Sequence, residues 1–276
     1  MTARAGQSGT TPPRRDADSR FQSHIVADTQ YSQYVTEPAS RGSLRDRLYE
    51  AYASQHAGRG SGDATVLIYR RDIRPALPAP RAGLVLDIGC GQGELLRLLL
   101  ADGYDAEGID VSPEQVALAH AAGLDQVQEG DYRNILKARA GKLAAVTATD
   151  VLEHLTKPEV LDTFDHVAAA LAPGGVFVAR VPNAVSPFGG HIRYGDFTHE
   201  SWYTERCVRQ LAAAAGFGSV TVLPCPPIAH GVVSAARVAL WRLISTVCKI
   251  ALAAETGVLR GHIVTQNLTF VARKAG

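Results

Sequence analysis

Three histidines in the second half of the chain stand where the general base of an enzymatic reaction could lie. They are His154, His191 and His199. A neutral imidazole has an unperturbed pKa of about 6.5, so it can take a proton from a hydroxyl group near neutral pH. His199 is the favoured base, because Asp196 and Glu200 beside it could orient its ring. His154 is the second candidate, since it follows a predicted strand end. For each histidine, a purely structural role is the alternative.

Metal binding is the alternative for the same segment. His199, Asp196 and Glu200 could hold a divalent cation that binds a sugar diol. These acids are few and lie in one loop, so base catalysis is favoured and no metal site is predicted. The four cysteines also have no CxxC spacing, which argues against zinc and is typical of free thiols in a reducing compartment.

A glycine-rich turn follows the first strand-like segment. The residues DIGCGQG at 87–93 end a predicted strand and open a helix. Glycines there allow a tight turn and a close approach of a ligand to the backbone. The dinucleotide fingerprint has a third glycine where this chain has Glu94, whose carboxylate would repel a pyrophosphate at the helix N-terminus. Asp87 suits a ligand carrying an ammonium or sulfonium group, so NAD and FAD are disfavoured.

Two further acids end the next two strand-like segments. Asp110 stands where a carboxylate can accept hydrogen bonds from both hydroxyl groups of a ribose. Asp131 could accept a hydrogen bond from the amino group of an adenine. The three strand ends together therefore predict a site for an adenosine derivative.

Strand-like and helix-like segments alternate from residue 83 onward. Strands are predicted at 84–88, 106–111, 126–131, 144–150, 176–182, 220–223 and 267–273. Helices are predicted at 63–74, 93–102, from 112, at 156–171 and at about 200–215. The helices opened by Ser112 and Thr156 carry the pattern of a capping box, with Gln115 and Glu159 at its third position. This alternation favours βαβ units and a parallel sheet.

Five segments in this order resemble the class I S-adenosylmethionine-dependent methyltransferases. They are VLDIGCGQGELL (85–96), GIDVSPEQ (108–115), EGD (129–131), TDVLEHL (149–155) and LAPGGVFVARVPN (171–183). The resemblance implies an α/β fold with a doubly wound, seven-stranded, mostly parallel sheet (a Rossmann-like methyltransferase fold) whose last strand is antiparallel. It also implies S-adenosyl-L-methionine as the cofactor.

The same resemblance implies which residues contact the cofactor. Those expected by its methionine part are Asp87, which orders the loop, with Gly89, Cys90, Gly91, Asp150, Val151 and Leu152. Those expected by its adenosine part are Asp110, Val111, Asp131 and Tyr132.

Three other segments resemble a bacterial subgroup that acts in surface-polysaccharide and secondary-metabolite pathways. They are YEAYASQH (49–56), RYGDFTHE (193–200) and GHIVTQNL (261–268). This implies a small-molecule or saccharide substrate that is methylated on a hydroxyl group. An amine, a phosphoramidate or a phenol as acceptor, and a non-catalytic adenosyl-binding protein, are the open alternatives.

Composition excludes several other classes of protein. The 276 residues are 46% hydrophobic and 20% charged, with a formal net charge of +1, which is ordinary for an enzyme and argues against a nucleic-acid partner. The first 20 residues have no apolar core, so no signal peptide is predicted and we expect a cytoplasmic protein.

The chain has three predicted parts. Residues 1–43 are polar and predict a disordered N-terminal tail. Residues 44–80 predict an N-terminal helical lid, and residues 81–276 the methyltransferase domain with a helical insert at about 231–256. The first lid helix is predicted at 44–55. Tyr49 and Tyr52 on this helix, and His56 just after it, could form part of a lid over the pocket, and packing in a core is the favoured role for the two tyrosines.

The segment 232–254 within the insert is apolar nearly all round. Arg237, Arg242 and Lys249 interrupt it, so it is not predicted to span a membrane. Such a helix must be buried, pair with another subunit or touch a membrane surface. A partly buried subdomain or a homodimer contact is favoured, and peripheral contact with a lipid surface is the alternative.

Overall fold

The computed structural model describes residues 62–276, all within the unit Leu44–Gly276. The predicted tail at 1–43 and the first lid helix, with Tyr49, Tyr52 and His56, lie outside the described residues. The second lid helix is present in three short pieces: α3 (Gly62–Ile68), the π-helix η3 (Tyr69–Ile73) and the 3-10 helix η4 (Arg74–Ala76). The domain boundaries therefore stay predictions.

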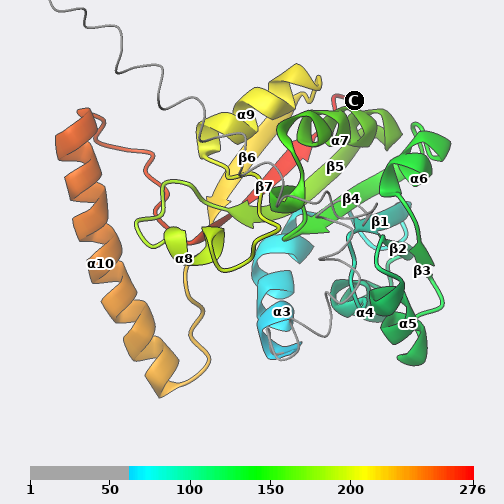
Figure 1. Cartoon of the computed structure of the whole chain (residues 1–276), viewed down its shortest axis with the longest axis horizontal. Coiled ribbons are helices and arrows are strands. Elements are labelled where there is room, and N and C mark those ends of the chain that lie inside the picture. The colour runs from blue at the N-terminus through cyan, green and yellow to red at the C-terminus, as the bar shows by residue number, and fades with distance from the viewer. Residues whose placement is uncertain (1–61) are drawn as a thin grey trace, which may run out of the picture. The chain divides into compact units, whose positions relative to one another are not determined.

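Seven strands form one mixed sheet (Figure 1). They are β1 (Leu84–Ile88), β2 (Ala106–Asp110), β3 (Val127–Glu129), β4 (Leu143–Thr149), β5 (Leu171–Pro182), β6 (Ser219–Pro224) and β7 (Asn267–Arg273). Their order across the sheet is β3-β2-β1-β4-β5-β7-β6, and the first five are parallel. β7 runs antiparallel to both of its neighbours, β5 and β6. The predicted fold class is confirmed.

Helices cover both faces of the sheet. On one face the buried core includes residues of α6 (Tyr132–Ala138), α7 (Lys157–Ala170) and α9 (Glu205–Ala214). On the other it includes residues of η3, α4 (Glu94–Ala101) and α5 (Pro113–Ala121). Figure 1 shows these two helical layers above and below the strands. The parallel strands are apolar on both sides, as expected for strands buried between helices.

Sequence patterns did not predict α6, and they placed the start of α9 wrongly. α6 is a short helix. Its N-cap is Asp131, whose side chain accepts a hydrogen bond from the backbone N–H of Arg133 at 2.9 Å. α9 begins at Glu205 rather than near residue 200. Residues before it are extended, and Tyr203 forms a bridge with Asn183 instead.

Only one of the two predicted capping boxes forms completely. At α7 the backbone N–H of Thr156 donates to the Glu159 carboxylate at 2.8 Å. At α5 the Ser112 hydroxyl caps the helix, but the Ser112 backbone N–H donates to Asp110 at 2.8 Å. Because that N–H is already bonded, the Gln115 side chain does not complete the box and is left for another partner.

The insert forms α10 (Val232–Thr256), which stands at the edge of the molecule in Figure 1. One side of the helix is half-buried, while a stripe of apolar side chains is exposed on the other. The exposed stripe comprises Val233, Leu240, Leu243, Val247 and Ile250. Among the residues from 62 onward, no helix is long and apolar enough to cross a membrane. The predicted homodimer contact and the predicted peripheral membrane contact both stay predictions.

Candidate active site

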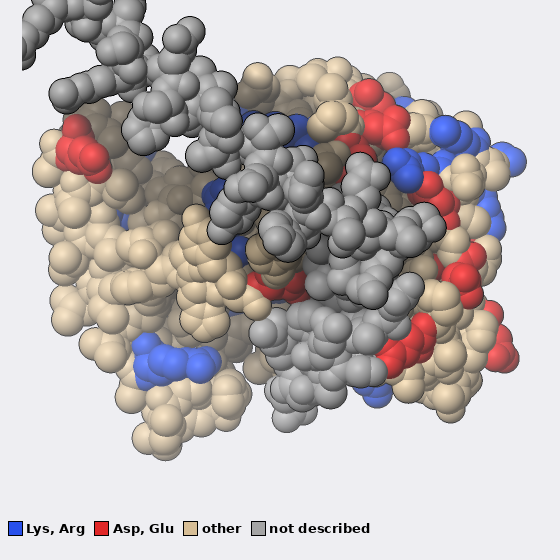
Figure 2. All heavy atoms as spheres, viewed as in Figure 1, with Lys and Arg blue, Asp and Glu red and all other residues tan. Residues whose placement is uncertain are grey.

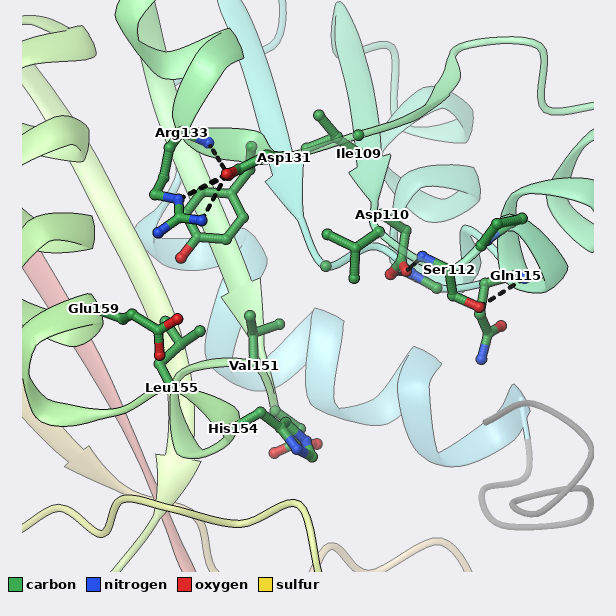
Figure 3. Close-up of a pocket in the computed structure, with 17 residues that line it drawn as sticks. Ile109, Asp110, Ser112, Gln115, Asp131, Arg133, Val151, His154, Leu155 and Glu159 are labelled. Carbon is green, nitrogen blue, oxygen red and sulfur yellow. Dashed lines mark hydrogen bonds and ion pairs between the residues drawn. The ribbon is translucent and has the colours of Figure 1, made fainter. Parts of the chain in front are cut away.

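A cavity of about 500 Å³ opens at the carboxyl ends of the central strands (Figure 3). In open α/β sheets, ligands bind in this position. Eight of the eleven residues expected to contact the cofactor line it: Gly89, Gly91, Asp110, Val111, Asp131, Tyr132, Asp150 and Val151. The structure thus brings together residues from four strand ends that are up to about sixty positions apart in the chain.

The carboxylate of Asp110 is held at the tip of β2 by two backbone groups. The N–H of Gly91 donates to one oxygen and the N–H of Ser112 to the other, each at 2.8 Å. Burial raises the pKa of Asp110, and these two hydrogen bonds oppose that effect. Each oxygen keeps a lone pair that can accept a further hydrogen bond from a ligand.

Asp87, Cys90 and Leu152 do not line the cavity. Asp87 is buried behind the glycine turn, where the Thr147 hydroxyl donates to its carboxylate at 2.6 Å. Cys90 lies against Gly108, and a Cβ on that glycine would meet its Sγ at 2.7 Å. Leu152 belongs to the apolar core. These three side chains support the cavity wall and do not face the ligand space.

Gly89 must be glycine for two reasons. Its φ of +63° lies in the left-handed region, which costs a residue with a side chain about 1–2 kcal/mol. A Cβ there would also lie 2.5 Å from Cγ2 of Val151, a residue that follows β4. The backbone of the turn after β1 therefore packs directly against the side chain of Val151 after β4. Because no side chain projects from Gly89, the cavity stays open beside this contact.

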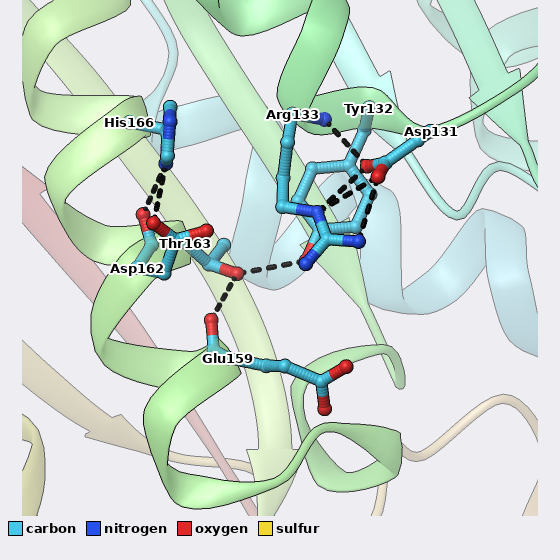
Figure 4. Close-up of polar contacts among 7 residues, drawn as sticks. All are labelled: Asp131, Tyr132, Arg133, Glu159, Asp162, Thr163 and His166. Carbon is cyan, nitrogen blue, oxygen red and sulfur yellow. Dashed lines mark hydrogen bonds and ion pairs between the residues drawn. The ribbon is translucent and has the colours of Figure 1, made fainter.

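Asp131 is already bound within the protein. Its carboxylate accepts from Nε and Nη2 of Arg133, at 2.9 and 2.6 Å (Figures 3 and 4). The hydrogen bonds from the Arg133 side chain are the largest cause that lowers the pKa of Asp131. Tyr132 points its hydroxyl toward Thr163 of α7, at 2.7 Å. An adenine amino group would share Asp131 with Arg133.

Gln115 is a cavity residue that sequence reasoning treated only as a helix cap. Its side-chain oxygen is buried and has no hydrogen-bond partner within residues 62–276. Burying a polar atom without a partner is costly. The only signal in the sequence was the position of Gln115 in a predicted capping box, and this signal indicated the backbone N–H of Ser112 as its partner.

His154 lies at the edge of the cavity, in the short helix η5 (Leu152–His154). Its Nδ1 is 2.7 Å from the hydroxyl of Thr198, which in turn donates to Asp196 at 2.6 Å. A hydroxyl has one proton, so Nδ1 of His154 must be the donor to Thr198. The lone pair of the neutral ring is then on Nε2, where it can accept a proton.

Asp196 is the negative end of this chain of hydrogen bonds. Burial alone would raise the pKa of its carboxyl, but the two hydrogen bonds from Thr198 and the nearby His154 and His199 outweigh it. The pKa is lowered to about 2, so Asp196 is ionised at neutral pH. Asp196 thus helps to orient His154 through Thr198.

The loop that carries Thr198 is fixed to η5 by its backbone. The N–H groups of Glu200 and Ser201 both donate to the carbonyl of Glu153, at 2.7 and 3.0 Å. Tyr203 donates its hydroxyl proton to the carbonyl of Leu152 at 2.8 Å. These contacts bring a segment more than forty residues away against His154.

The other two candidate bases, His199 and His191, lie farther from the cavity. The ring of His199 packs edge-on against His154, with centroids 4.8 Å apart, and its Nδ1 donates to the carbonyl of Ile192 at 3.0 Å. It does not line the cavity. His191 is exposed on the short helix α8 (Gly190–Arg193).

Three side chains could hold a metal ion, and only His199 is among those weighed as metal ligands from the sequence. One ligand atom each of Glu153, His154 and His199 lies within 4.8 Å of the others. Burial, followed by the charge of Asp150, raises the pKa of Glu153 well above its usual value. A raised pKa opposes the loss of the proton that a carboxyl must release before it can bind a metal, so base catalysis stays the favoured interpretation of this cluster.

Comparison with known proteins identifies a family. A family model described as a methyltransferase domain matches residues 67–222, which is more than half of the chain. A ubiquinone biosynthesis O-methyltransferase of Xylella fastidiosa is 32% identical over 110 residues, covering 38% of this chain and 44% of that protein. The match spans less than half the length of this relative.

Solved structures share the fold. A SAM dependent methyltransferase from Archaeoglobus fulgidus aligns with a TM-score of 0.62 and 22% identity, over 81% of this chain and 99% of that one. Phosphoethanolamine N-methyltransferase 2 of Haemonchus contortus, in complex with S-adenosyl-L-methionine, aligns with a TM-score of 0.56 and 18% identity, over 87% and 61%. At these identities the likeness concerns the fold alone.

Proposed function

Because this chain belongs to the class I S-adenosylmethionine-dependent methyltransferases, we propose that it methylates a hydroxyl group of a small molecule, with His154 as the general base. A sugar is the acceptor that the subgroup resemblance favours. The observation that carries the proposal is the chain of hydrogen bonds Asp196–Thr198–His154, which leaves Nε2 of His154 as a proton acceptor beside the cavity.

The residues around the cavity fit S-adenosylmethionine. Asp110 has lone pairs for the ribose hydroxyls, and the unpartnered oxygen of Gln115 can accept from a polar hydrogen of the ligand. The backbone at Gly89 and Gly91 leaves room for the amino-acid part. Four acids, Asp110, Asp131, Asp150 and Glu159, line the cavity, which favours a cation. When bound, the cofactor supplies a methyl group on a positively charged sulfur.

The protein's own part in the reaction is to orient the acceptor and remove its proton. Alignment of reacting groups supplies much of the rate in a displacement of this kind. Nε2 of His154 would take the hydroxyl proton, and the ionised Asp196, acting through Thr198, would stabilise the imidazolium. Asp150, which lines the cofactor cavity, forms an ion pair with Arg180, which lines a second cavity.

A hydroxyl acceptor is favoured over an amine because of this base. A neutral amine has a lone pair without losing a proton, whereas an alcohol is a poor nucleophile while it is protonated. The relative named as an O-methyltransferase agrees with this preference. An amine or a phenol remains the alternative acceptor.

The test is to compare single histidine substitutions in the full chain. Release of S-adenosylhomocysteine is measured with a panel of sugars, nucleotide sugars, phenols and amines. We expect His154→Ala to lower kcat about 10²- to 10⁴-fold with hydroxyl acceptors, since that is the usual contribution of a general base. His199→Ala should have a smaller effect. His166→Ala, in α7, is the matched control and should retain full activity.

Two results would reject the assignment. If His199→Ala loses activity while His154→Ala retains it, the base is His199. If only amine acceptors release S-adenosylhomocysteine, the proposal of O-methylation fails although the family stands.

A further inference from the structure

A second cavity, of about 850 Å³, lies beside the first. Its wall is built from α3, η3, the end of β5, the chain after β6, and α10. None of the residues predicted from the sequence to bind the cofactor or act as base lines it. α10, the helix of the insert, closes one side.

The charges of this cavity are opposite to those of the first. Arg71, Arg180 and Arg237 line it, and no aspartate or glutamate does so within the described chain. The cofactor cavity, by contrast, is lined by four acids. Figure 2 shows acidic and basic side chains mixed over α5, α6 and α7, while the surface of α10 is mostly uncharged. The second cavity is thus suited to an anion.

Two of the three arginines are held in place by the protein. Arg71 donates from Nε and Nη2 to the buried Asp72, both at 2.6 Å, and from Nη1 to the carbonyl of Pro226. Arg180 pairs through Nη1 with Asp150, and its buried Nε has no partner in the part of the chain that the structure describes. A fixed guanidinium loses little entropy when it binds a ligand.

Arg237 contributes a positive charge that forms no ion pair within residues 62–276. It stands on α10 one turn from Trp241, and both line the cavity. The ring of Trp241 approaches Phe188 of the opposite wall, with centroids 6.2 Å apart. An aromatic pair of this kind can pack against an apolar or ring-shaped part of a ligand.

The ion pair between Asp150 and Arg180 joins the two cavities. Asp150 lines the cofactor cavity and Arg180 the second cavity. A molecule that binds in the second cavity therefore ends close to the position where the methyl group is transferred. This is the place where the acceptor of a methyltransferase must lie.

We propose that the second cavity binds the phosphate or pyrophosphate group of the acceptor, so that the substrate is a phosphorylated sugar. The inference rests on the proposed function, which it makes more specific. Guanidinium groups bind phosphate oxygens in pairs, and three of them suit more than one charge. The insert α10 has a role in this view: it carries Arg237 and Trp241 to the acceptor.

The test measures binding without turnover. The full chain, loaded with S-adenosylhomocysteine, is titrated calorimetrically with glucose, glucose 1-phosphate and UDP-glucose. We expect both phosphorylated probes to bind, glucose to give no detectable heat, and the affinity to fall as salt rises. Arg237→Gln should weaken binding of the phosphorylated probes about tenfold, the usual loss of one charged hydrogen bond.

Arg242→Gln is the matched control, because it makes the same charge change on α10 outside the cavity. It should bind the probes as the wild-type protein does. Absence of binding by both phosphorylated probes, or equal loss in Arg237→Gln and Arg242→Gln, overturns the inference. Binding of S-adenosylhomocysteine in the same samples separates this failure from failure of the proposed function.

Discussion

Thr147, on β4, donates its hydroxyl proton to the carboxylate of Asp87, on β1, at 2.6 Å, and both side chains are almost completely buried. The contact joins two neighbouring strands directly beneath the glycine turn. Burial raises the pKa of Asp87 from 3.8 to about 7, although the hydrogen bond from Thr147 opposes the shift. An acid placed there makes the glycine turn sensitive to pH.

The first prediction concerns the stability of an Asp87→Asn variant. Between pH 3.8 and about 7 the folded protein holds a proton on Asp87 that the unfolded chain has lost. The contribution of this group to the free energy of unfolding therefore falls as pH rises through that window. We expect the variant to gain up to about 4 kcal/mol relative to wild type between the two ends.

Urea unfolding of both proteins from pH 4 to pH 8 measures this difference. Other carboxyls titrate in both proteins, so their effects cancel in the comparison. A difference that stays constant across the range would show that Asp87 titrates normally in the folded state.

The second prediction concerns the glycine turn. Gly89→Ala should weaken binding of S-adenosylhomocysteine at least about tenfold, because the new Cβ meets Val151 at 2.5 Å in a backbone conformation already costly for alanine. Gly174→Ala is the control, since Gly174 also has a positive φ but has nothing within 4 Å. The control should lose about 1 kcal/mol of stability and keep its affinity.

Calorimetric titration gives the affinity and urea unfolding the stability. Wild-type affinity in Gly89→Ala would mean that the turn does not contact the cofactor. Adding Val151→Ala should recover part of the loss, because it removes the clash and leaves the backbone strain.

The third prediction separates a positioning role from a structural one. Thr198→Val breaks the link between Asp196 and His154, so we expect kcat to fall about tenfold with little change in KM. Asp196→Asn removes the negative charge, so the acidic limb of the pH–rate profile should move to lower pH. Ser201→Ala, which removes a nearby hydroxyl bonded to the carbonyl of Leu155, is the matched control.

If Thr198→Val and Ser201→Ala lower activity equally, the effect is structural. An unchanged pH profile in Asp196→Asn would mean that the base is not coupled to Asp196.

The fourth prediction concerns metal ions. Because His154 is proposed to act as a base, incubation with EDTA should leave turnover unchanged. Added Zn²⁺ should inhibit, since it would bind the imidazole nitrogen atoms of His154 and His199 near Glu153. His199→Ala should weaken this inhibition. Loss of activity in EDTA that Mg²⁺ restores would instead identify the cluster as a catalytic metal site.

The sheet and the cofactor end of the site were predictable because both are local in sequence. Short apolar runs in the sequence predict the strands, and the glycines and acids that follow these runs mark where the strands end. This is how β1, its glycine turn and the acids at the ends of β2 and β3 were found. Residues at the carboxyl ends of parallel strands lie at the same edge of the sheet, so they can be placed together without knowledge of any long-range contact. For Asp87 this reasoning placed the residue on the right strand end but not behind the cavity wall.

The arrangement around His154 and Arg180, where we propose that the acceptor binds, was not predictable because it depends on contacts between distant segments. Thr198 carries no signal of its own, and it becomes important only because the backbone of Glu200 and Ser201 binds the carbonyl of Glu153. Likewise, Arg180 reads as an ordinary polar residue in a strand. Its pairing with Asp150 arises only when β4 and β5 lie side by side.

The strand order has a consequence for how the chain is made. β6 lies at the edge of the sheet, where β7 is its only neighbour among the described strands. β7 follows β6 in the chain only after α10, so β6 has no partner strand until β7 has been synthesised. A chain shortened before Asn267 should leave β6 unpaired and prone to aggregate, even though every residue that lines the cofactor cavity would be present.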